Sequence, residues 1–506
     1  MTKQLIFIRK LSHVCKLKPY KETKWLMPNG NPTGLYVYNC VANEKVPIIL
    51  NDPHVATWYS CGPTVYDSAH LGHASCYVKL DIIQRILKSF FNVKLITAMG
   101  ITDIDDKIIK KAKDTNTDFT VVAKQYEHEF WLDMASLNIE KPLIITKVSD
   151  NITTIEKFVK NLIDNELAYI TSDGSVYFDT NKYKSYGKLQ KAQDNDEPKS
   201  SEKRNEMDFA LWKGQKPGEP SWEVSWGKGR PGWHVECSAM VSRVFGSQLD
   251  FHAGGIDLQF PHHENEEAQS CAFHNTRQWA NYWIHVGHLI LKDTKMSKSL
   301  KNTISITSLL EHYSADAFRM ACLMSNYRYP MDYSDNVIRT AEDVLKKFKH
   351  FLKEADIYVN RSNKEGQYCD SLLDDLQKTE EQIGDALKND FDTASCINCL
   401  LNLIIKTNRV IKLDTKQYYP IPVMLVCEYV VLILSKFGLK LENSENNISN
   451  SVIDTLVAFR QSVRTNAISK KDKELLTACD IVRDKLKTMK IIINDSNKGS
   501  SWISSK

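Results

Sequence analysis

One stretch decides the fold of this chain, the sequence YSCGPTVYDSAHLGH at residues 59–73. The β-type run Ala56-Thr57-Trp58-Tyr59 leads into it, and Gly62-Pro63 and Gly72 are turn residues. After His73, apolar residues recur at helical spacing, at Tyr77, Leu80, Ile83, Ile86 and Leu87. The pattern predicts a strand–loop–helix unit of the kind that binds nucleotides.

The loop of this unit carries one thiol, Cys61, and the two histidines of the sequence His70-Leu71-Gly72-His73. We expect both histidines to face a phosphate at the helix N-terminus, where free N–H groups and the helix dipole favour anions. A buried cysteine and two surface histidines on a glycine turn would give the same residues, so the motif alone leaves both readings open.

The composition is typical of a globular protein of two to four domains. The chain has 506 residues, 25% of them charged and 42% apolar, with a net charge of +4. This mild basicity permits a nucleic-acid partner without establishing one. The twelve cysteines lack regular spacing, which favours reduced thiols that are free to bind metal. The longest apolar run, residues 423–434, is too short for a membrane span and contains Glu428, so we expect a buried helix and no membrane partner.

The first residues are basic and lack acidic side chains. Residues 1–21 contain six lysines and arginines, and the first acidic residue is Glu22. Leu5, Ile6, Phe7, Ile8 and Leu11 can form an apolar face. This pattern favours a mitochondrial transit peptide, and a basic arm that touches RNA is the alternative.

A possible metal site draws on residues that are far apart in the sequence. Pro261 suits a helix start, which would place His262 and Glu266 on one helix face. Cys61 and Cys237 are expected at strand ends, and zinc takes thiolate, imidazole and carboxylate ligands. The helix dipole alone would also favour acidic residues in a first helical turn, so the spacing does not decide between a metal site and this structural explanation. The Cys396-x-x-Cys399 pair lies in a helical pattern and is assigned to core packing.

A second phosphate-binding candidate is the lysine-rich loop Lys292–Asn302. Lys295 and Lys298 are three residues apart among small residues and could reach a polyphosphate, although exposed basic loops are common on any surface.

His70-Leu71-Gly72-His73 and Lys295-Met296-Ser297-Lys298-Ser299 resemble the two hallmark motifs of class I aminoacyl-tRNA synthetases. Four further stretches resemble the cysteinyl-tRNA synthetases: Cys61-Gly62-Pro63-Thr64-Val65-Tyr66-Asp67, Ile101-Thr102-Asp103-Ile104-Asp105-Asp106-Lys107-Ile108, Gly232-Trp233-His234-Val235-Glu236-Cys237-Ser238 and Pro261-His262-His263-Glu264-Asn265-Glu266. The resemblance runs from about residue 35 to residue 345. Ser75 stands where many family members have Arg, and Lys301 where they have Gly, which resembles the animal mitochondrial branch.

The resemblance implies roles for individual residues. It implies one zinc ion, which takes the substrate thiolate and is held by Cys61, Cys237, His262 and Glu266. It implies an amino-acid pocket that includes Gly62, Thr102, Trp233 and His252. It implies contacts to ATP and its Mg²⁺-bound phosphates from His70, His73, Asp257, Lys295 and Lys298.

The activity that the resemblance implies is that of a cysteine–tRNA ligase. Cysteine and ATP would form cysteinyl-adenylate, and the cysteinyl group would pass to tRNA(Cys) for translation in the mitochondrial matrix. We expect no editing domain, because a site built around the thiol rejects serine, and we favour a monomer.

The expected fold is α/β, a Rossmann-like doubly wound parallel sheet with an inserted α+β subdomain, followed by an all-α bundle. The expected divisions are these: 1–35 transit peptide or extension, 36–144 first half of the catalytic domain, 145–220 inserted connective subdomain, 221–308 second half with the zinc ligands and the lysine loop, 309–345 stem-contact connecting region, 346–490 helical anticodon-binding bundle, and 491–506 disordered tail. Helices are predicted at about 335–357, 370–388, 391–412, 421–437, 451–465 and 472–489.

Three other readings stay open. Cysteine:sugar ligases share such a catalytic domain but lack a long helical C-terminal region, and a non-catalytic RNA-binding relative would lack motif residues. The mitochondrial branch is also associated with cysteine persulfide formation, which would use pyridoxal phosphate on lysines near Lys107, Lys110, Lys295 and Lys298.

Overall fold

The computed structural model describes residues 24–190, 202–291, 294–296, 303–361, 369–412, 419–441, 445–488, 491–496 and 499–504. The chain forms two compact units, which divide between Lys440 and Leu441 and are described separately below. The predicted transit peptide therefore lies mainly outside the described residues.

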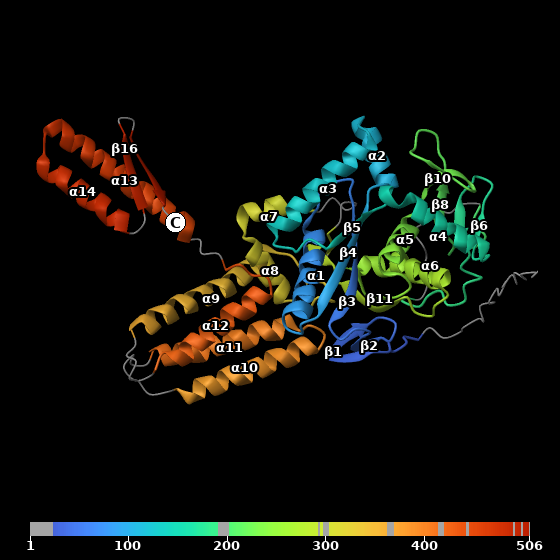
Figure 1. Cartoon of the computed structure of the whole chain (residues 1–506), viewed down its shortest axis with the longest axis horizontal. Coiled ribbons are helices and arrows are strands. Elements are labelled where there is room, and N and C mark those ends of the chain that lie inside the picture. The colour runs from blue at the N-terminus through green and yellow to red at the C-terminus, as the bar shows by residue number, and fades with distance from the viewer. Residues whose placement is uncertain are drawn as a thin grey trace, which may run out of the picture. The chain divides into compact units, whose positions relative to one another are not determined.

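The first unit is organised around a five-stranded parallel sheet, as the sequence predicts (Figure 1). Its spatial order is β12-β11-β3-β4-β5, and every neighbouring pair is parallel. The strands are β3 (Val55–Thr64), β4 (Lys94–Thr102), β5 (Ile144–Lys147), β11 (Leu249–Gly255) and β12 (Ala280–Val286). A Rossmann-like, doubly wound α/β fold is confirmed.

The strand order reverses next to β3, and this reversal places the site. From β3 the chain builds outward through β4 and β5, and later returns to pair β11 on the other side of β3. In doubly wound sheets, ligands bind beyond the carboxyl ends of the strands at such a reversal. The carboxyl end of β3 carries Cys61 and Gly62, and that of β11 leads to Asp257.

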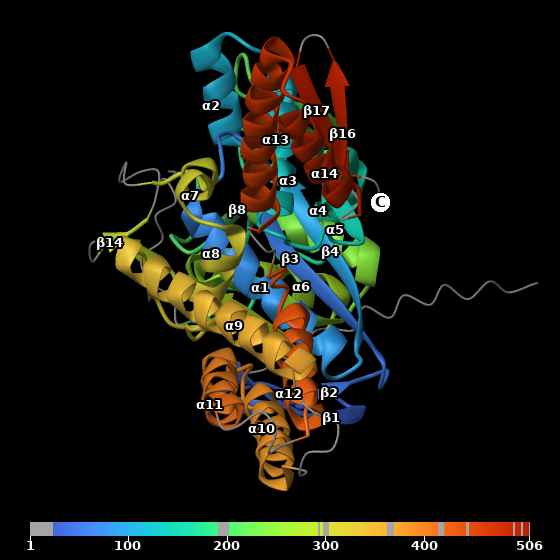
Figure 2. The ribbon, with the colours of Figure 1, turned by 90° about the vertical axis from the view of Figure 1, so that its left-hand side faces the viewer.

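The helix α1 (Leu71–Ser89) follows β3, as predicted, and lies against the sheet in both ribbon views (Figures 1 and 2). Its N-cap is His70, whose side chain accepts the backbone N–H of Gly72. The apolar residues that predicted the helix, Tyr77, Leu80 and Ile83 among them, are buried. After β4 come α2 (Asp106–Thr115) and α3 (Phe119–Ser136).

The inserted subdomain is built on its own antiparallel sheet, in the order β6-β7-β8-β10-β9. Its elements are η1 (Ser149–Asn151), α4 (Ile152–Asp164), β6 (Ala168–Ile170), β7 (Val176–Phe178), β8 (Phe209–Gly214), β9 (Trp222–Val224) and β10 (Gly227–Pro231). Two predicted details are wrong here. Residues 144–147 pair in the main sheet rather than opening the insertion, and residues 229–231 pair with β8 rather than resuming the main sheet.

After the insertion, the chain returns through α5 (Trp233–Phe245) to β11. The elements that follow are η2 (Ile256–Leu258), η3 (Gln259–His263), α6 (Glu264–His274), β13 (Leu289–Leu291), β14 (Thr294–Lys295), α7 (Ile306–His312), α8 (Ala315–Leu323) and β15 (Met331–Asp332). Cys237 therefore lies on a helix, and not at a strand end as predicted.

The folded structure begins earlier than the boundary predicted at residue 36. The hairpin β1 (Asn31–Asn39) and β2 (Glu44–Leu50) is antiparallel, and Trp25 donates a hydrogen bond to the Asn281 carbonyl at 2.9 Å. Residues 25–35 thus belong to the first unit.

The C-terminal region is helical, as predicted, but it divides between the two units. The first unit contains α9 (Asp335–Arg361), α10 (Asp370–Lys388), α11 (Thr393–Lys412) and α12 (Ile421–Lys436), which group together in both ribbon views (Figures 1 and 2). The second unit contains α13 (Glu445–Lys470), α14 (Lys473–Thr488), β16 (Ile491–Ser496) and β17 (Gly499–Ser504). The prediction of a disordered tail is wrong, because β16 and β17 form an antiparallel hairpin and Arg460 pairs with Asp495 at 2.8 Å.

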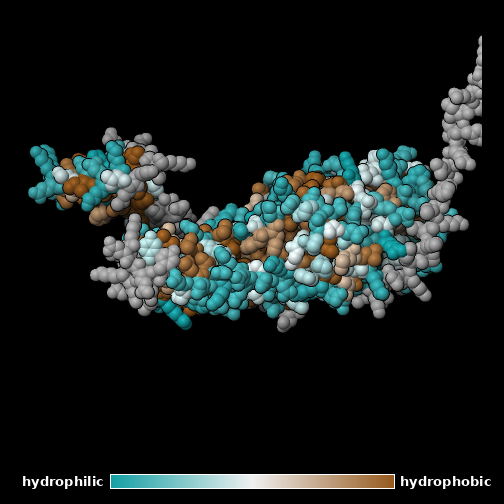
Figure 3. Space-filling view, turned by 60° about the horizontal axis from the view of Figure 1, so that its bottom comes forward, coloured by the Kyte–Doolittle hydropathy of each residue, from teal (hydrophilic) through white to brown (hydrophobic). Residues whose placement is uncertain are grey.

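On the face that Figure 3 shows, hydrophilic residues are mixed with hydrophobic ones. Among the described residues, no helix has both the length and the apolar character that a membrane span requires.

Candidate active site

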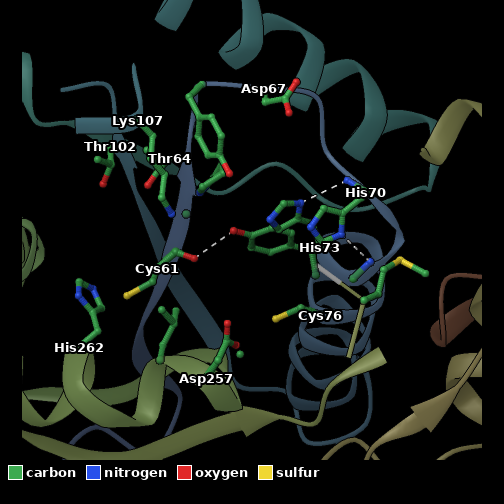
Figure 4. Close-up of a pocket in the computed structure, with 18 of the residues that line it drawn as sticks. Cys61, Thr64, Asp67, His70, His73, Cys76, Thr102, Lys107, Asp257 and His262 are labelled. Atoms are coloured by element: carbon green, nitrogen blue, oxygen red, sulfur yellow. Dashed lines mark hydrogen bonds between the residues drawn. The ribbon is translucent and has the colours of Figure 1, made fainter. Parts of the chain in front are cut away.

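A pocket of about 710 Å³ lies at the carboxyl ends of the main strands (Figure 4). Residues from β3, the loop after it and the first turns of α1 line one part of it. Of the predicted site residues, the pocket is lined by Cys61, Gly62, His70, His73, Thr102, Trp233, Cys237, Asp257 and His262. The structure thus brings together residues from five segments of the sequence.

Four buried side chains converge as a potential metal site, and three of them, Cys61, Cys237 and His262, line the pocket. Donor atoms of Cys61, Cys237, His262 and Glu266 all lie within 4.8 Å of one another. The two thiol sulfurs are 3.9 Å apart, and the Cys61 sulfur is 3.5 Å from Glu266 Oε1. Tetrahedral zinc with two thiolates would place the sulfurs about 3.8 Å apart, so the donor set fits zinc in chemistry and in spacing.

A second donor set shares two of these residues. Cys61 and Glu266 also lie within reach of His252 and His263, with 3.4 Å from the Cys61 sulfur to His263 Nε2. His252 and His263 are fully buried and do not line the pocket, whereas Cys61, Cys237 and His262 do. Only the set with Cys237 and His262 therefore faces a substrate. His252 does not line this pocket, and its Nε2 contacts Glu266 Oε2 at 2.9 Å, so its role as an amino-acid contact stays a prediction.

Burial by itself lowers the pKa of His262, but Glu266 and Cys237 outweigh it and raise that pKa to about 10, so a proton on this imidazole balances the charge of the cluster until a metal cation displaces it. Burial by itself raises the pKa of Glu266, but His252 and His262 outweigh it and lower that pKa to about 2. A hydrogen bond from Cys61 is the main reason why the pKa of Cys237 falls to about 6, while burial raises the pKa of Cys61. One thiolate and one carboxylate are thus stabilised side by side.

Sequence reasoning missed His234, which orients the imidazole of His262. The Nδ1 atoms of the two rings are 3.0 Å apart, and His262 Nε2 lies 3.0 Å from Glu266 Oε1. The bond at Nδ1 directs Nε2 toward the other donors, as outer-shell partners of metal-binding histidines do. In the sequence, the signal that could have indicated a role for His234 was its position in the segment that also contains Trp233 and Cys237.

Trp233 and Thr102 lie beside the cluster. Trp233 lines the pocket, is 38% exposed and stacks on His262 with ring centroids 4.3 Å apart. Thr102 donates a hydrogen bond to Glu236 at 3.1 Å. Both positions agree with a wall of a small amino-acid pocket.

Gly62 is required by a close approach of two strands. A Cβ at this position would lie 2.2 Å from the Gly100 carbonyl oxygen on β4. Glycine therefore lets β3 pass β4 closely next to Cys61.

The two histidines of the loop cap α1 through their Nδ1 atoms. His70 Nδ1 accepts from Gly72 N at 3.1 Å, and His73 Nδ1 accepts from His70 N at 3.3 Å, with the rings stacked 4.0 Å apart. The expectation of free N–H groups at this helix end is wrong for Leu71 and Gly72. Gly72 N donates to His70 Nδ1, and Leu71 N donates to the Ile304 carbonyl at 3.0 Å. Neutral rings that accept at Nδ1 carry a proton on Nε2.

The lysine loop is only partly described. The backbone of Lys295 forms β14, and Met296 lines the pocket, while Lys298 lies outside the described residues. Asp257 lines the pocket and lies near Cys76 of α1 (Figure 4).

A parallel sheet with this pocket and these two motifs defines the catalytic domain of a class I aminoacyl-tRNA synthetase. Residues 48–343 match the family model for the class I (C) tRNA synthetase catalytic domain. The methionyl-tRNA synthetase of Mycobacterium tuberculosis shares the fold with a TM-score of 0.57 and 15% identity, over 75% of this chain and 90% of that one.

Two curated relatives narrow the class. One, named probable cysteine–tRNA ligase, mitochondrial, from Xenopus tropicalis, is 40% identical over 94% of this chain and 91% of its own length. Another, named cysteine–tRNA ligase, cytoplasmic, from Dictyostelium discoideum, is 38% identical over 93% of this chain and 77% of its own length. The chain belongs to the cysteinyl-tRNA synthetase family.

Proposed function

We propose that this enzyme selects cysteine with a zinc ion, activates it with ATP and transfers it to tRNA(Cys). One observation carries the proposal: two thiols and an imidazole that line the same pocket as His70 and His73 meet the buried carboxylate of Glu266.

Cys61, Cys237, His262 and Glu266 would hold the zinc. Bound there, zinc supplies a strong ligand bond to a substrate thiolate, whereas the hydroxyl of serine is a much weaker ligand. Because the wrong substrate cannot make this contact, selection needs no editing step.

The protein's own groups then position the reactants. All three of Trp233, Thr102 and Asp257 line the pocket. We assign Trp233 and Thr102 to the amino acid and Asp257 to the nucleotide. The Nε2–H groups of His70 and His73, with Lys295, Lys298 and Mg²⁺, would stabilise the charge on the phosphates while the cysteine carboxylate attacks the α-phosphorus. Positioning and charge stabilisation would supply most of the rate.

The decisive experiment is ATP–pyrophosphate exchange that depends on cysteine, with serine as the control and zinc content measured in parallel. We expect exchange with cysteine, one zinc per chain, and a loss of cysteine binding on chelation that far exceeds the loss of ATP binding. Equal losses of both would refute the assigned role of the metal. Aminoacylation with and without tRNA separates this activity from that of a cysteine:sugar ligase, and any exchange excludes a non-catalytic relative.

A second activity, cysteine persulfide formation with pyridoxal phosphate, has one supporting observation. Lys107 and Lys110 of α2 line the active-site pocket, whereas Lys113 of the same helix does not. Their amines could hold the aldehyde cofactor. Borohydride reduction followed by peptide mass spectrometry should find the adduct at Lys107, Lys110, Lys295 or Lys298 and not at Lys113; the absence of any adduct would refute this activity.

We also propose that the enzyme acts in the mitochondrial matrix. The basic, acid-poor leader supports this location, and so does the relative from Xenopus tropicalis that is named mitochondrial. Fusion of residues 1–35 to a fluorescent protein should direct it to mitochondria; a diffuse signal would contradict the proposal.

A further inference from the structure

A buried cluster of charges joins α1 to the end of the helical bundle. We call it the Arg319 cluster, and its members are Asp81, Arg85, Asn138, Arg319 and Gly438. Arg319 on α8 is 1% exposed and Asp81 on α1 is 3% exposed. Burying a guanidinium is costly unless its N–H groups are paired, so Arg319 needs hydrogen-bond acceptors for them.

Arg319 donates to four acceptors on separate parts of the fold. Nη1 contacts Asp81 Oδ2 at 2.5 Å and the Phe437 carbonyl at 3.3 Å. Nη2 contacts the carbonyls of Leu137 and Asn138 at 3.0 and 2.8 Å. One side chain thus ties α1 to the residues after α3 and to the C-terminal end of α12, where a cation also complements the helix dipole.

The other members complete the cluster. Arg85, one turn after Asp81 on α1, donates to Asp81 Oδ2 at 2.8 Å and to the Asn138 carbonyl at 3.0 Å. The amide of Asn138 donates to the Gly438 carbonyl at 2.6 Å. Asp81 and both arginines therefore share partners, which fixes their positions relative to one another.

Gly438 lies where any larger residue would disturb the cluster. Its φ is +83°, and a Cβ would meet Arg319 Nη1 and Arg85 Nε at 2.9 Å each. Two residues later, Lys440 N donates to Asp316 Oδ1 of α8 at 3.1 Å. The segment 437–440, which leads into the second unit, is thus fixed to α8 and, through Asp81, to α1.

The position of α1 matters for catalysis because its N-cap is His70 and its first turn carries His73. We propose that Arg319 is a positioning residue, which acts through Asp81 to hold these histidines in place relative to the segment that leads into the second unit. Contacts of tRNA with the C-terminal helices then favour aminoacylation through this cluster. The inference rests on the proposed tRNA ligase function and on anticodon-arm binding by the helical region.

The test compares two RNA substrates in three proteins. The substrates are full-length tRNA(Cys) and an acceptor-stem RNA that lacks the anticodon arm. The proteins are the wild type, Gly438→Ala, which adds a Cβ against both arginines and keeps every charge, and Gly384→Ala as the matched control. Gly384 lies on α10, and a Cβ there would meet nothing within 4 Å.

We expect the ratio of kcat/KM for full-length tRNA to that for the acceptor-stem RNA to fall about tenfold in Gly438→Ala, within the range of coupling between distant sites. The control should keep the wild-type ratio. Arg319→Lys, which keeps the charge but cannot reach four acceptors, should lower the ratio in the same direction.

Other outcomes overturn the inference. If Gly438→Ala lost kcat/KM equally with both RNAs, the cluster would only support the fold. If the ratio of the two kcat/KM values stayed at the wild-type level in Gly438→Ala, or if the wild type did not prefer full-length tRNA, no coupling would pass through the cluster. Circular dichroism separates unfolding from either result. Failure of the proposed function is distinguishable, because the wild type would then lack cysteine-dependent pyrophosphate exchange.

Discussion

Replacing His234 with phenylalanine tests whether the orientation of His262 sets the affinity of the proposed zinc site. His234 is buried, its Nδ1 lies 3.0 Å from His262 Nδ1, and its ring packs edge-on against Phe209 with centroids 5.7 Å apart. Phenylalanine keeps the ring and its packing but removes the hydrogen bond. His262 would then lose the contact that directs Nε2 toward Glu266 and Cys237.

The magnitude follows from two considerations. Loss of a hydrogen-bonded partner of a metal-binding histidine costs about 10- to 100-fold in metal affinity or activity, which is about 1.4 to 2.7 kcal/mol. Leaving the buried Nδ1 of His262 without this partner costs about 1 to 3 kcal/mol. The two free-energy costs are of the same size, so we expect zinc affinity to fall by about 10- to 100-fold. The KM for cysteine should rise, and the KM for ATP should change little.

The assay combines zinc retention against a competing chelator with pyrophosphate exchange at varied cysteine and ATP. The control is His274→Phe, the same change at a histidine of α6 that bonds Ser242 at 2.8 Å and does not line the pocket. If His234→Phe retained zinc and bound cysteine as tightly as the wild type does, the assigned role of His234 would be refuted.

Three further predictions concern other parts of the molecule. Gly62→Ala should destabilise the fold by about 1 to 3 kcal/mol and raise the KM for cysteine, because its Cβ would lie 2.2 Å from the Gly100 oxygen. Denaturant unfolding measures the change in the free energy of unfolding, which the control Gly384→Ala should not lower. Lys298→Ala should slow adenylate formation by about 100-fold with unchanged cysteine affinity, as single-turnover kinetics would show, and an unaltered rate would remove Lys298 from the mechanism. A hydrogen bond from Arg460 lowers the pKa of Asp495 from 3.8 to about 2, so this pair stabilises the second unit above pH 4 or so and loses that effect as the pH falls through about 2. The difference in Tm between the wild type and Asp495→Asn should therefore shrink from pH 5 to pH 2, and a difference independent of pH would contradict the pairing.

The sequence predicted the main elements because their signals are local. Hydrophobic spacing predicted α1, and it placed α9, α10, α11, α12 and α14 within four residues of their observed bounds. The helix predicted at 451–465 is longer in the structure, where α13 spans Glu445–Lys470. The turn residues after β3 marked the strand–loop–helix unit. Where the predictions were wrong, long-range pairing decided the outcome: residues 229–231 could extend either sheet, and their pairing with Trp212, Lys213 and Gly214 placed them in the insertion.

The chemical groups of the site could be named from the sequence alone: the thiols, the histidines, the two phosphate motifs and the order in which a doubly wound sheet presents them. Which of these groups meet depends on how the distant elements pack. Cys61 and Cys237 are separated by 176 positions, yet their sulfurs lie 3.9 Å apart, because β3, α5 and η3 converge at one edge of the sheet. The partners of His234 and Arg319 were likewise not predictable, because a buried polar side chain takes its hydrogen bonds from whichever elements pack against it, and packing depends on the whole fold.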